Sequence, residues 1–566
     1  MTSIFKQALR AHQAGQAAAA EALYRQAIIA GIEVRSARHN LALLLLERYA
    51  FAEAKALLLE LIASPDADAA THFMLARILV AEGDEAAALA PLEQALALEP
   101  GSVPVRLELA RLLAGKQELT RARSLLENLP GNTAPADRLA ALRTRAEIEI
   151  AWADLDEAEE AAHLAAAEKA LRDGLALAPQ QPALLNNLAM LLRRQGALEE
   201  AEMLARKLLA IAPQVPESSM TLAAVLAGRD PQREAEALAL LERAAATAPK
   251  HASLNWNLAY SLLRLKRFRE AWPRHARRFE RPQRAPAPPG PRWDGKPIDK
   301  PLLIWGEQGF GNIIQFARFL PRIALFTPHL ILACQKPLLR LMAQIPGLTQ
   351  AVDFTATLPP YGAQYPLLDL GLILGIEAND LPGEIPYLRA PDSDAPWNEV
   401  QAAPSPRIGI VWAGNRYPDP HRSTTLDRFV RLAKRFDISF FSLQIGPAEA
   451  DIAHEGEGRI IDLAPLIRDF ADTAAAIARL DLVITIDTAV AHLAGALGGP
   501  VWTLLPHRAG WPWHFDPEHS SWYPTMRLFR QAAVGDWEGA FARVEAALAE
   551  WLAAHPGRTQ PTDRSA

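Results

Sequence analysis

The residues best suited to chemistry stand in the segment VITIDTAVAHLAGALGGPVWTLL (483–505). Its pattern predicts a buried strand, a polar turn, a short helix and a second buried strand. Asp487 and Thr488 fall in the turn, where side-chain oxygens can cap the free N–H groups of the helix. A helix start also attracts anions, because its N–H groups and its dipole point outward. His492 lies four residues after Thr488 on the same helix face. Two interpretations stay open: a phosphate site, or a turn that only caps its helix.

A second candidate loop is GEQGFGNIIQFARFL (306–320), which follows a predicted strand. Gly309 and Gly311 allow a ligand to approach the backbone closely, and a helix starts near Asn312. The spacing G-x-x-G-x-G is neither the dinucleotide fingerprint nor a Walker loop. Glu307 is the only carboxylate in the loop. It is therefore the obvious base, with a loop-anchoring role as the alternative.

Further polar residues follow other predicted strands. Arg422, in IVWAGNRYPDPHRSTTLDRF (410–429), can neutralise a diphosphate with two parallel hydrogen bonds. Gln444 ends the next strand, where an amide can read a nucleobase or ribose. The D-x-D triplet at 392–394 recurs at 66–68 and 154–156, so we interpret it as coincidence. With no H-E-x-x-H motif, no metal site is expected.

Composition narrows the class of protein. The chain has 566 residues, of which 50% are hydrophobic and 22% charged, and this profile predicts several soluble domains. The net charge of −6 argues against a nucleic-acid-binding protein. The single cysteine, Cys334, excludes an internal disulfide framework. Neither a signal peptide nor an apolar run long enough to span a membrane is apparent, so a cytoplasmic location is expected.

Residues 1–280 are rich in alanine and leucine and show helical periodicity. Ala76, Gly83 and Pro100 recur in register as Ala189, Gly196 and Pro213. A small residue allows close helix packing, glycine closes the turn, and proline stops the second helix. The pattern resembles the tetratricopeptide repeat, with a period near 34 residues and about eight units, one of them (131–179) stretched by an insertion. Such helix pairs stack into a superhelix with a concave binding groove.

Three asparagines stand two residues before the small alanine of their repeat, in the string NLA: Asn40, Asn187 and Asn257. Amides in register can hold the backbone of an extended peptide, because each both donates and accepts hydrogen bonds. The matching position holds Met74, Glu108 or Thr221 in other repeats. Peptide holding and a plain interhelix role both stay open.

The second half alternates strands and helices, which implies parallel sheets. The predicted strands are 301–305, 329–334, 407–414, 439–444, 480–486 and 500–505. A proline-rich linker (281–300) separates the repeats from a first lobe at 301–395 and a second lobe at 396–550. The ligand cleft is expected between the lobes, and residues 551–566 are expected to be a disordered tail.

Four segments occur in the order of a known family: WGEQGFGNIIQFARFLP, IGIVWAGN, RDFADTAAAIARLDLVITIDTAVAHLAGALGGPVW and WYPTMRLFRQ. They resemble the heptosyltransferase-like glycosyltransferase domain that ends some bacterial repeat proteins. The layout is similar to O-GlcNAc transferases and repeat-bearing flagellin glycosyltransferases. The resemblance implies a GT-B fold of two Rossmann-like lobes, a nucleotide-sugar donor on the second lobe, and neither metal nor cofactor. By motif match, Asp487, Thr488, Ala489 and His492 would contact donor sugar and diphosphate, with Arg422 on the phosphates and Gln444 on the nucleotide.

The chain departs from this family at one position. The family's first loop reads G-x-G-D, and its aspartate acts as the base that activates the acceptor hydroxyl. Asn312 stands there in this chain, and a neutral amide cannot take up a proton at working pH. Either Glu307 or a group of the acceptor replaces the base, or catalysis is weak or absent.

The sequence therefore predicts a cytoplasmic glycosyltransferase that moves a sugar from a nucleotide donor to an acceptor held by the repeats, a protein such as flagellin. One alternative is a repeat scaffold with a degenerate transferase domain, and another is a heptosyltransferase acting on lipopolysaccharide. The sequence identifies neither the sugar, the nucleotide, the acceptor nor the oligomeric state.

Overall fold

The computed structural model describes residues 3–64, 67–156, 158–281, 287–391, 397–403, 405–415, 419–456 and 458–555. The chain forms two compact units, Met1–Leu191 and Leu192–Ala566. The division falls inside a repeat helix, Pro182–Gln195, and not at the proline-rich connector. The second unit therefore contains repeat helices as well as the α/β region.

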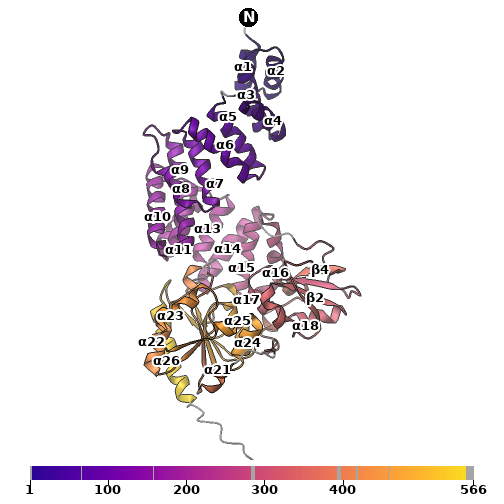
Figure 1. Cartoon of the computed structure of the whole chain (residues 1–566), viewed down its shortest axis with the longest axis vertical. Helices are drawn as coiled ribbons and strands as arrows, with labels where there is room; N and C mark the ends of the chain where they lie inside the picture. The colour runs from indigo at the N-terminus through magenta and orange to yellow at the C-terminus, as the bar shows by residue number, and fades with distance from the viewer. Residues whose placement is uncertain are drawn as a thin grey trace, which may run out of the picture. The chain divides into compact units, whose positions relative to one another are not determined.

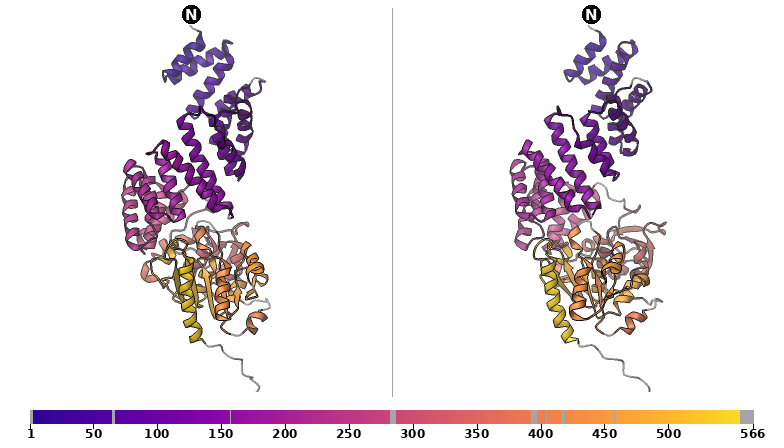
Figure 2. Two further views of the ribbon diagram at one scale, coloured as in Figure 1. Left: turned by 90° about the vertical axis from the view of Figure 1, so that its left-hand side faces the viewer. Right: turned by 60° about the vertical axis from the view of Figure 1, so that its left-hand side comes forward.

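Consecutive helices form the first unit and stack as successive pairs (Figure 2). They are α1 (Ile4–Gln13), α2 (Ala17–Ile29), α3 (Val34–Glu47), α4 (Phe51–Ile62), α5 (Ala69–Ala81), α6 (Glu85–Leu98), α7 (Val103–Gly115), α8 (Leu119–Glu127), α9 (Pro135–Leu155), α10 (Glu160–Leu177) and most of α11 (Pro182–Gln195). The long pair α9 and α10, of 21 and 18 residues, accounts for the repeat that the sequence shows as stretched.

The repeat positions behave as their residue types require. Ala42, Ala76 and Ala189 are 0% exposed, so a larger side chain would separate packed helices. Gly83 and Gly196 close their turns at φ +81° and +83°, a conformation that favours glycine. The predicted helical-repeat half is confirmed.

The second unit continues the repeats and then changes to α/β structure. Its repeat helices are α12 (Leu198–Ile211), α13 (Pro216–Leu226), α14 (Pro231–Thr247), α15 (Ala252–Arg264) and α16 (Phe268–His275), followed by the 3₁₀ turn η1 (Ala276–Glu280). In chain order α1 to α16 make eight pairs, which matches the predicted number of repeats.

A four-stranded parallel sheet follows, in the order β3-β2-β1-β4. Its strands are β1 (Leu302–Trp305), β2 (Leu330–Cys334), β3 (Leu348–Asp353) and β4 (Ala363–Pro366). Helices α17 (Phe310–Ala317) and α18 (Leu320–Ile323) connect β1 to β2, and α19 (Leu339–Met342) connects β2 to β3. After β4 come η4 (Leu367–Asp369) and α20 (Leu370–Ile373). β1 and β2 are buried throughout, as the continuous apolar runs predict.

A six-stranded parallel sheet completes the unit, in the order β10-β9-β8-β5-β6-β7. Its strands are β5 (Ile408–Val411), β6 (Phe440–Ser442), β7 (Ile460–Asp462), β8 (Leu482–Ile486), β9 (Val501–Leu505) and β10 (Met526–Arg530). Numbered from β5 and read from the other edge, this is the doubly wound order 3-2-1-4-5-6. The chain reverses direction across the sheet between β5 and β8.

Helices cover both faces of the six-stranded sheet (Figure 1). They are α21 (Asn398–Ala402), α22 (Leu426–Phe436), α23 (Asp451–Glu455), α24 (Phe470–Ile477), α25 (Ala489–Ala496) and α26 (Trp537–Ala554). α22 and α26 pack on one face, where Phe429, Phe440 and Phe541 are buried together. α25 packs on β8 and β9.

Three of the segments discussed from the sequence lie partly or wholly outside the described residues. α26 continues to Ala554, so the segment 551–554 is helical and not part of a disordered tail. Residues 556–566, the D-x-D triplet at 392–394 and positions 282–286 of the connector lie outside the described residues. No helix in the described part of the chain has the length and apolar character of a membrane span.

Candidate functional site

Strands β5 and β8 lie side by side in the middle of the six-stranded sheet, and the candidate site is at their carboxyl ends. The two strands are neighbours, with Val411 paired to Thr485. Asp487 and Thr488 directly follow β8, and Gly414 lies just beyond β5. Ligands of doubly wound sheets bind at this position, because the chain reverses there and leaves a crevice.

Three predicted ligand contacts meet around Gly414. A Cβ atom at Gly414 would lie 3.3 Å from Thr488 Cγ2 and 3.5 Å from Arg422 Nε. Arg422 Nε donates to the carbonyl of Asn415 at 2.7 Å, which holds the guanidinium beside the loop. Arg422 also acts electrostatically on Asp487. The family resemblance predicted this cluster, and the pairing of β5 with β8 explains it, because the carboxyl ends of adjacent parallel strands share one edge.

Helix α25 begins at Ala489, with Thr488 as its N-cap residue. Among the described groups, the Thr488 side chain makes no capping hydrogen bond. Its hydroxyl lies 3.1 Å from the Thr485 hydroxyl. The Thr488 side chain therefore leaves the first-turn N–H groups to another acceptor, which favours an anion site over a plain cap.

The Asp487 carboxyl lies in a mixed electrostatic field. Burial raises its pKa, and a hydrogen bond from the Trp513 side chain together with the charges of Arg422 and Arg530 opposes that rise. Asp419 adds a like charge and raises the pKa further. Asp487 thus accepts from an indole N–H and is flanked by cations, which offset the cost of burying its carboxylate.

His492 contacts Trp513, the residue that hydrogen-bonds Asp487. Its ring stacks on Trp513 with centroids 5.0 Å apart, and its Nδ1 lies 3.0 Å from the Tyr523 hydroxyl. Burial and the charge of Arg318 lower the His492 pKa to about 3, so the imidazole is neutral near pH 7. The geometry is that of a side chain that positions Trp513. Direct contact with donor or acceptor stays a prediction.

Gln444 is buried, and its side chain bonds the loop after β5. Its Oε1 accepts from the backbone N–H of Ala413 at 3.0 Å and of Trp412 at 3.3 Å. The amide thereby fixes the path of the chain toward Gly414. A nucleotide contact by Gln444 stays a prediction.

The glycines of the first loop have different surroundings. A Cβ atom at Gly309 would have no described heavy atom within 4 Å, as expected of a position that faces a ligand. A Cβ atom at Gly311 would lie 2.8 Å from Cδ2 of His492. Gly311 therefore allows α17 and α25 to pack closely, a physical reason that spacing alone does not reveal.

Glu307 follows β1 and lies in a buried ion pair. Its Oε1 is 2.6 Å from Nη2 of Arg278, and the two side chains are 6% and 0% exposed. Arg278 also pairs with Asp369, which follows β4, and Arg292 donates to Asp369 Oδ2 at 2.6 Å. Glu307 thus anchors its loop to the last repeat element, which is the alternative role considered for it.

The second oxygen of Glu307 differs from the first. Oε2 is buried without a hydrogen-bond partner among the described residues. Burial raises the Glu307 pKa, against the charge of Arg278. A carboxylate with one oxygen in an ion pair and one oxygen without a hydrogen-bond partner can accept a proton from a group that comes into contact with it.

Asn312 is in the first turn of α17, partly exposed, where the resemblance places an acid. Its Nδ2 donates to Gln308 Oε1 at 2.8 Å. Gln335 Nε2 in turn donates to the Gln308 carbonyl at 2.7 Å. The amide ties the loop together at a position that gives no base.

The three ladder asparagines lie on α3, α11 and α15, and each is half-buried. Asn187 Oδ1 accepts from Asn186 Nδ2 at 3.0 Å. Peptide binding by Asn40, Asn187 and Asn257 stays a prediction. Within the described residues, no group of three or more His, Cys, Asp or Glu is placed to hold a metal ion.

Several residues of the site could not be identified from sequence motifs. Trp513, Tyr523 and Arg530 lie in the segment 506–531, whose aromatic and cationic composition is a signal without assigned roles. Arg278 belongs to residues 264–284, a run with nine Lys or Arg whose composition favours a solvated helix face. Only the fold shows that it is buried against Glu307.

Comparisons with known proteins identify the repeats. Residues 79–146 match the tetratricopeptide repeat family. Protein FlbA of Caulobacter vibrioides is 28% identical over 336 residues, which are 53% of this chain and 56% of that protein. The chain thus spans about half the length of this curated relative.

Solved structures of repeat proteins resemble part of the chain. A thermophilic tetratricopeptide repeat protein of Thermus thermophilus is 25% identical, covers 34% of this chain and 99% of its own, and has a TM-score of 0.30. A tetratricopeptide repeat protein of Parabacteroides merdae is 12% identical, covers 46% of this chain and 97% of its own, and has a TM-score of 0.37. The family match at residues 79–146 shows that the chain contains tetratricopeptide repeats, which are typical of protein–protein interaction.

Proposed function

We propose that the protein is a glycosyltransferase of GT-B type that takes its sugar from a nucleotide donor. The observation that carries this proposal is the convergence of Asp487, Thr488 and Arg422 at the reversal point of the six-stranded sheet. A diphosphate at this point meets a guanidinium and a helix N-terminus together.

The donor binds along the carboxyl edge of this sheet. Arg422 and the first turn of α25, from Ala489, neutralise the diphosphate, and Asp487 hydrogen-bonds the sugar. The nucleoside lies toward β6, where Gln444 is followed by Ile445, an apolar side chain that is 51% exposed. An exposed apolar residue beside an amide suits the face and edge of a base.

Transfer breaks the bond between the anomeric carbon and the diphosphate oxygen, and forms a bond from that carbon to the acceptor oxygen. The diphosphate leaves with the electron pair and is stabilised by Arg422 and the α25 dipole. The acceptor hydroxyl loses its proton to a base. Glu307 is the candidate, because its Oε2 is without a hydrogen-bond partner among the described residues and burial raises its pKa.

The acceptor is a protein held by the repeats. Tetratricopeptide repeats bind protein segments, and the asparagines in NLA register suit the backbone of an extended chain. Flagellin is one acceptor that the resemblance suggests.

A second function is favoured by a specific observation. Asn312 replaces the acid of the first loop, and Glu307 is engaged by Arg278. Both facts suit a repeat scaffold whose α/β region binds a nucleotide without transferring a sugar. The two functions differ in whether the chain turns over its donor.

Calorimetric titration of the full chain with a panel of nucleotide sugars tests donor binding. We expect one nucleotide class to bind, and Asp487→Ala to weaken binding of the sugar-bearing form more than that of the free nucleoside diphosphate. Release of nucleoside diphosphate in the presence of acceptor then separates the transferase from the scaffold.

Asp437→Asn is the matched control. Asp437 precedes β6 at the opposite, amino edge of the same sheet and its side chain is 86% exposed, so its replacement leaves donor affinity unchanged. Absence of binding by every nucleotide sugar, or equal loss in both variants, contradicts the proposed donor site.

A further inference from the structure

Arg264 and Arg508, from distant parts of the chain, meet around Gly228, and the charge of a third arginine, Arg193, acts on Arg508. Arg193 lies on α11, Arg264 ends α15, and Arg508 lies in the loop after β9. All three belong to the second compact unit. We call them the arginine seam. None of them takes part in the donor site proposed above.

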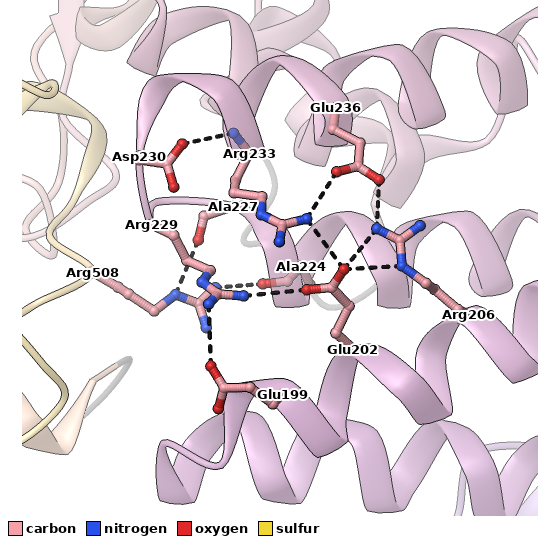
Figure 3. Close-up of polar contacts among 10 residues, drawn as sticks. All are labelled: Glu199, Glu202, Arg206, Ala224, Ala227, Arg229, Asp230, Arg233, Glu236 and Arg508. Atoms are coloured by element: carbon pink, nitrogen blue, oxygen red, sulfur yellow. Dashed lines mark hydrogen bonds and ion pairs between the residues drawn. The ribbon is translucent and has the colours of Figure 1, made fainter.

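Arg508 is fixed by the end of a repeat helix. Its Nε donates to the carbonyl of Ala227 at 3.0 Å, and its Nη2 donates to the carbonyl of Ala224 (Figure 3). A cation is favourable at this place, because the carbonyl end of α13 carries partial negative charge. The guanidinium is thus held at the seam by backbone groups.

Arg264 approaches the same turn from the other side. A Cβ atom at Gly228 would lie 3.6 Å from Arg508 Cβ and 3.9 Å from Arg264 Nε. Arg264 Nη1 is 3.5 Å from Glu234 Oε1, and that carboxylate is 0% exposed. Glu234 already accepts from the backbone N–H of Gly228 at 2.7 Å. One buried carboxylate is therefore shared among several donors.

Arg193 completes the seam. The charges of Arg193 and Arg264 both act on Arg508, and Asp419 and Glu234 oppose them. Burial, with these like charges, lowers the pKa of Arg508 well below its ordinary value. Burial also lowers the pKa of Arg193. The Nε atoms of Arg193 and Arg264 are buried without a hydrogen-bond partner among the described residues.

In a neighbouring cluster, glutamates balance the charge of every arginine (Figure 3). There, three arginines face three glutamates in a closed network: Arg206, Arg229 and Arg233 with Glu199, Glu202 and Glu236. The seam instead has three arginines, the carboxylates of Glu234 and Asp419, and two unused N–H groups. Crowded guanidinium groups of this kind are stabilised by an added anion.

We propose that Arg193, Arg264 and Arg508 bind a multiply charged phosphate anion, so that the last repeats themselves contribute to ligand binding. A diphosphate is the simplest ligand of this class, because its oxygens can accept from several planar guanidinium groups at once. The anion is either free pyrophosphate or the diphosphate of a nucleotide. The proposal does not depend on sugar transfer.

The experiment is calorimetric titration of the full chain with inorganic pyrophosphate, UDP and GDP at low and physiological salt. We expect pyrophosphate to bind, and Arg193→Gln to weaken its affinity about tenfold or more, because one charged bidentate donor is lost. Arg193→Lys retains the positive charge but loses the two parallel N–H donors of the guanidinium, so an intermediate affinity for pyrophosphate is expected.

Arg233→Gln is the matched control. This change also removes one arginine charge, but from α14 within the closed network. There Glu202 still forms ion pairs with Arg206 and Arg229. Pyrophosphate affinity is expected to stay within about twofold of the unaltered chain. Thermal unfolding of each variant shows whether the fold is intact.

The outcomes separate this site from the donor site. Pyrophosphate that fails to bind the unaltered chain, or binds Arg193→Gln as tightly, overturns the seam. If Arg193→Gln weakens the binding of nucleoside diphosphate and of pyrophosphate equally, the seam binds the diphosphate of a nucleotide. If the variant weakens the binding of pyrophosphate alone, the seam binds the free anion. Nucleotide sugars that bind without any effect of Arg193→Gln, while pyrophosphate does not bind, support the donor site alone.

Discussion

Gly311 packs directly against the ring of His492, so that the first turns of α17 and α25 lie in van der Waals contact. A Cβ atom at position 311 would lie 2.8 Å from Cδ2 of His492 and 3.6 Å from the Cα atom of Ala489. The loop that follows β1 and the helix that follows β8 are therefore held together by the absence of a single side chain. The two candidate halves of the active site depend on this contact for their spacing.

Gly311→Ala is expected to destabilise the protein by about 1–3 kcal/mol, because the added methyl must displace the His492 ring or the helix that carries it. Urea unfolding measures the change. Gly309→Ala is the control: its Cβ atom meets no described atom within 4 Å, and its φ of −60° suits any residue. Equal stability of the two variants would contradict close packing at Gly311.

The protein should become less stable as the pH is lowered, and His492 should account for part of this loss. Its pKa is lowered from 6.5 to about 3, so the unfolded chain takes up a proton that the folded chain refuses. The free energy of unfolding therefore decreases as pH falls below about 6.5, by up to about 1.4 kcal/mol for each pH unit.

His492→Gln is expected to reduce that slope between about pH 6 and pH 4, as measured by denaturant unfolding at several pH values. His519→Gln, at a side chain that is 76% exposed, serves as the comparison and should keep the slope of the unaltered chain. A slope that is the same in all three proteins would show that His492 is not the buried neutral group described above.

Arg278→Gln is expected to cost about 3–5 kcal/mol of unfolding free energy, because it leaves the buried carboxylates of Glu307 and Asp369 without their shared cation. Arg277→Gln, one residue earlier, breaks a pair with Glu280 on the surface and should cost less than about 1 kcal/mol. Similar losses in both variants, measured by urea unfolding, would place Arg278 on the surface.

Glu307→Gln tests the candidate base. The amide keeps the shape of the side chain and can still accept from Arg278, so we expect donor binding to persist while transfer falls about 10²- to 10⁴-fold. Nucleoside diphosphate release under single-turnover conditions is the measurement. Unchanged turnover would show that Glu307 only anchors its loop.

Asn312→Asp provides the reciprocal test. Position 312 is partly exposed in the first turn of α17, where a carboxylate is also favoured by the helix dipole. We expect increased turnover with unchanged donor affinity. If turnover is absent in both the unaltered chain and this variant while the donor still binds, the scaffold function is favoured.

Local patterns account for what the sequence could predict. Ala76 and Ala189 are buried and Gly83 and Gly196 close turns, because helix packing and positive φ are decided within a few residues. Apolar runs identified β1, β2, β5, β6, β8 and β9. The other strands were not predicted: β3 is an edge strand that is partly exposed, β4 ends in proline, β7 is an edge strand with only its first residue buried, and β10 is interrupted by arginine.

Long-range contacts account for what the sequence could not predict. Asp487, Thr488 and Arg422 were predicted to share a donor site because their motifs resemble those of a known family, and the pairing of β5 with β8 brings their segments together. Nothing local indicates that Arg278 is buried against a glutamate beyond the linker, or that Arg508 binds the carbonyls of Ala224 and Ala227. Such pairs depend on how the repeats dock on the α/β region, which no single segment encodes.

The hydrogen bonds of Arg508 to the end of α13 have a consequence for modularity. Trp272 Nε1 likewise donates to the carbonyl of Ile376 at 2.8 Å, and Gly371 lies against the Trp272 ring. The repeats from α12 onward are therefore part of the body that carries the sheets. Evolution or engineering that exchanges repeat arrays between such proteins should join them before Leu192, because a junction at the proline-rich connector would cut through a shared core.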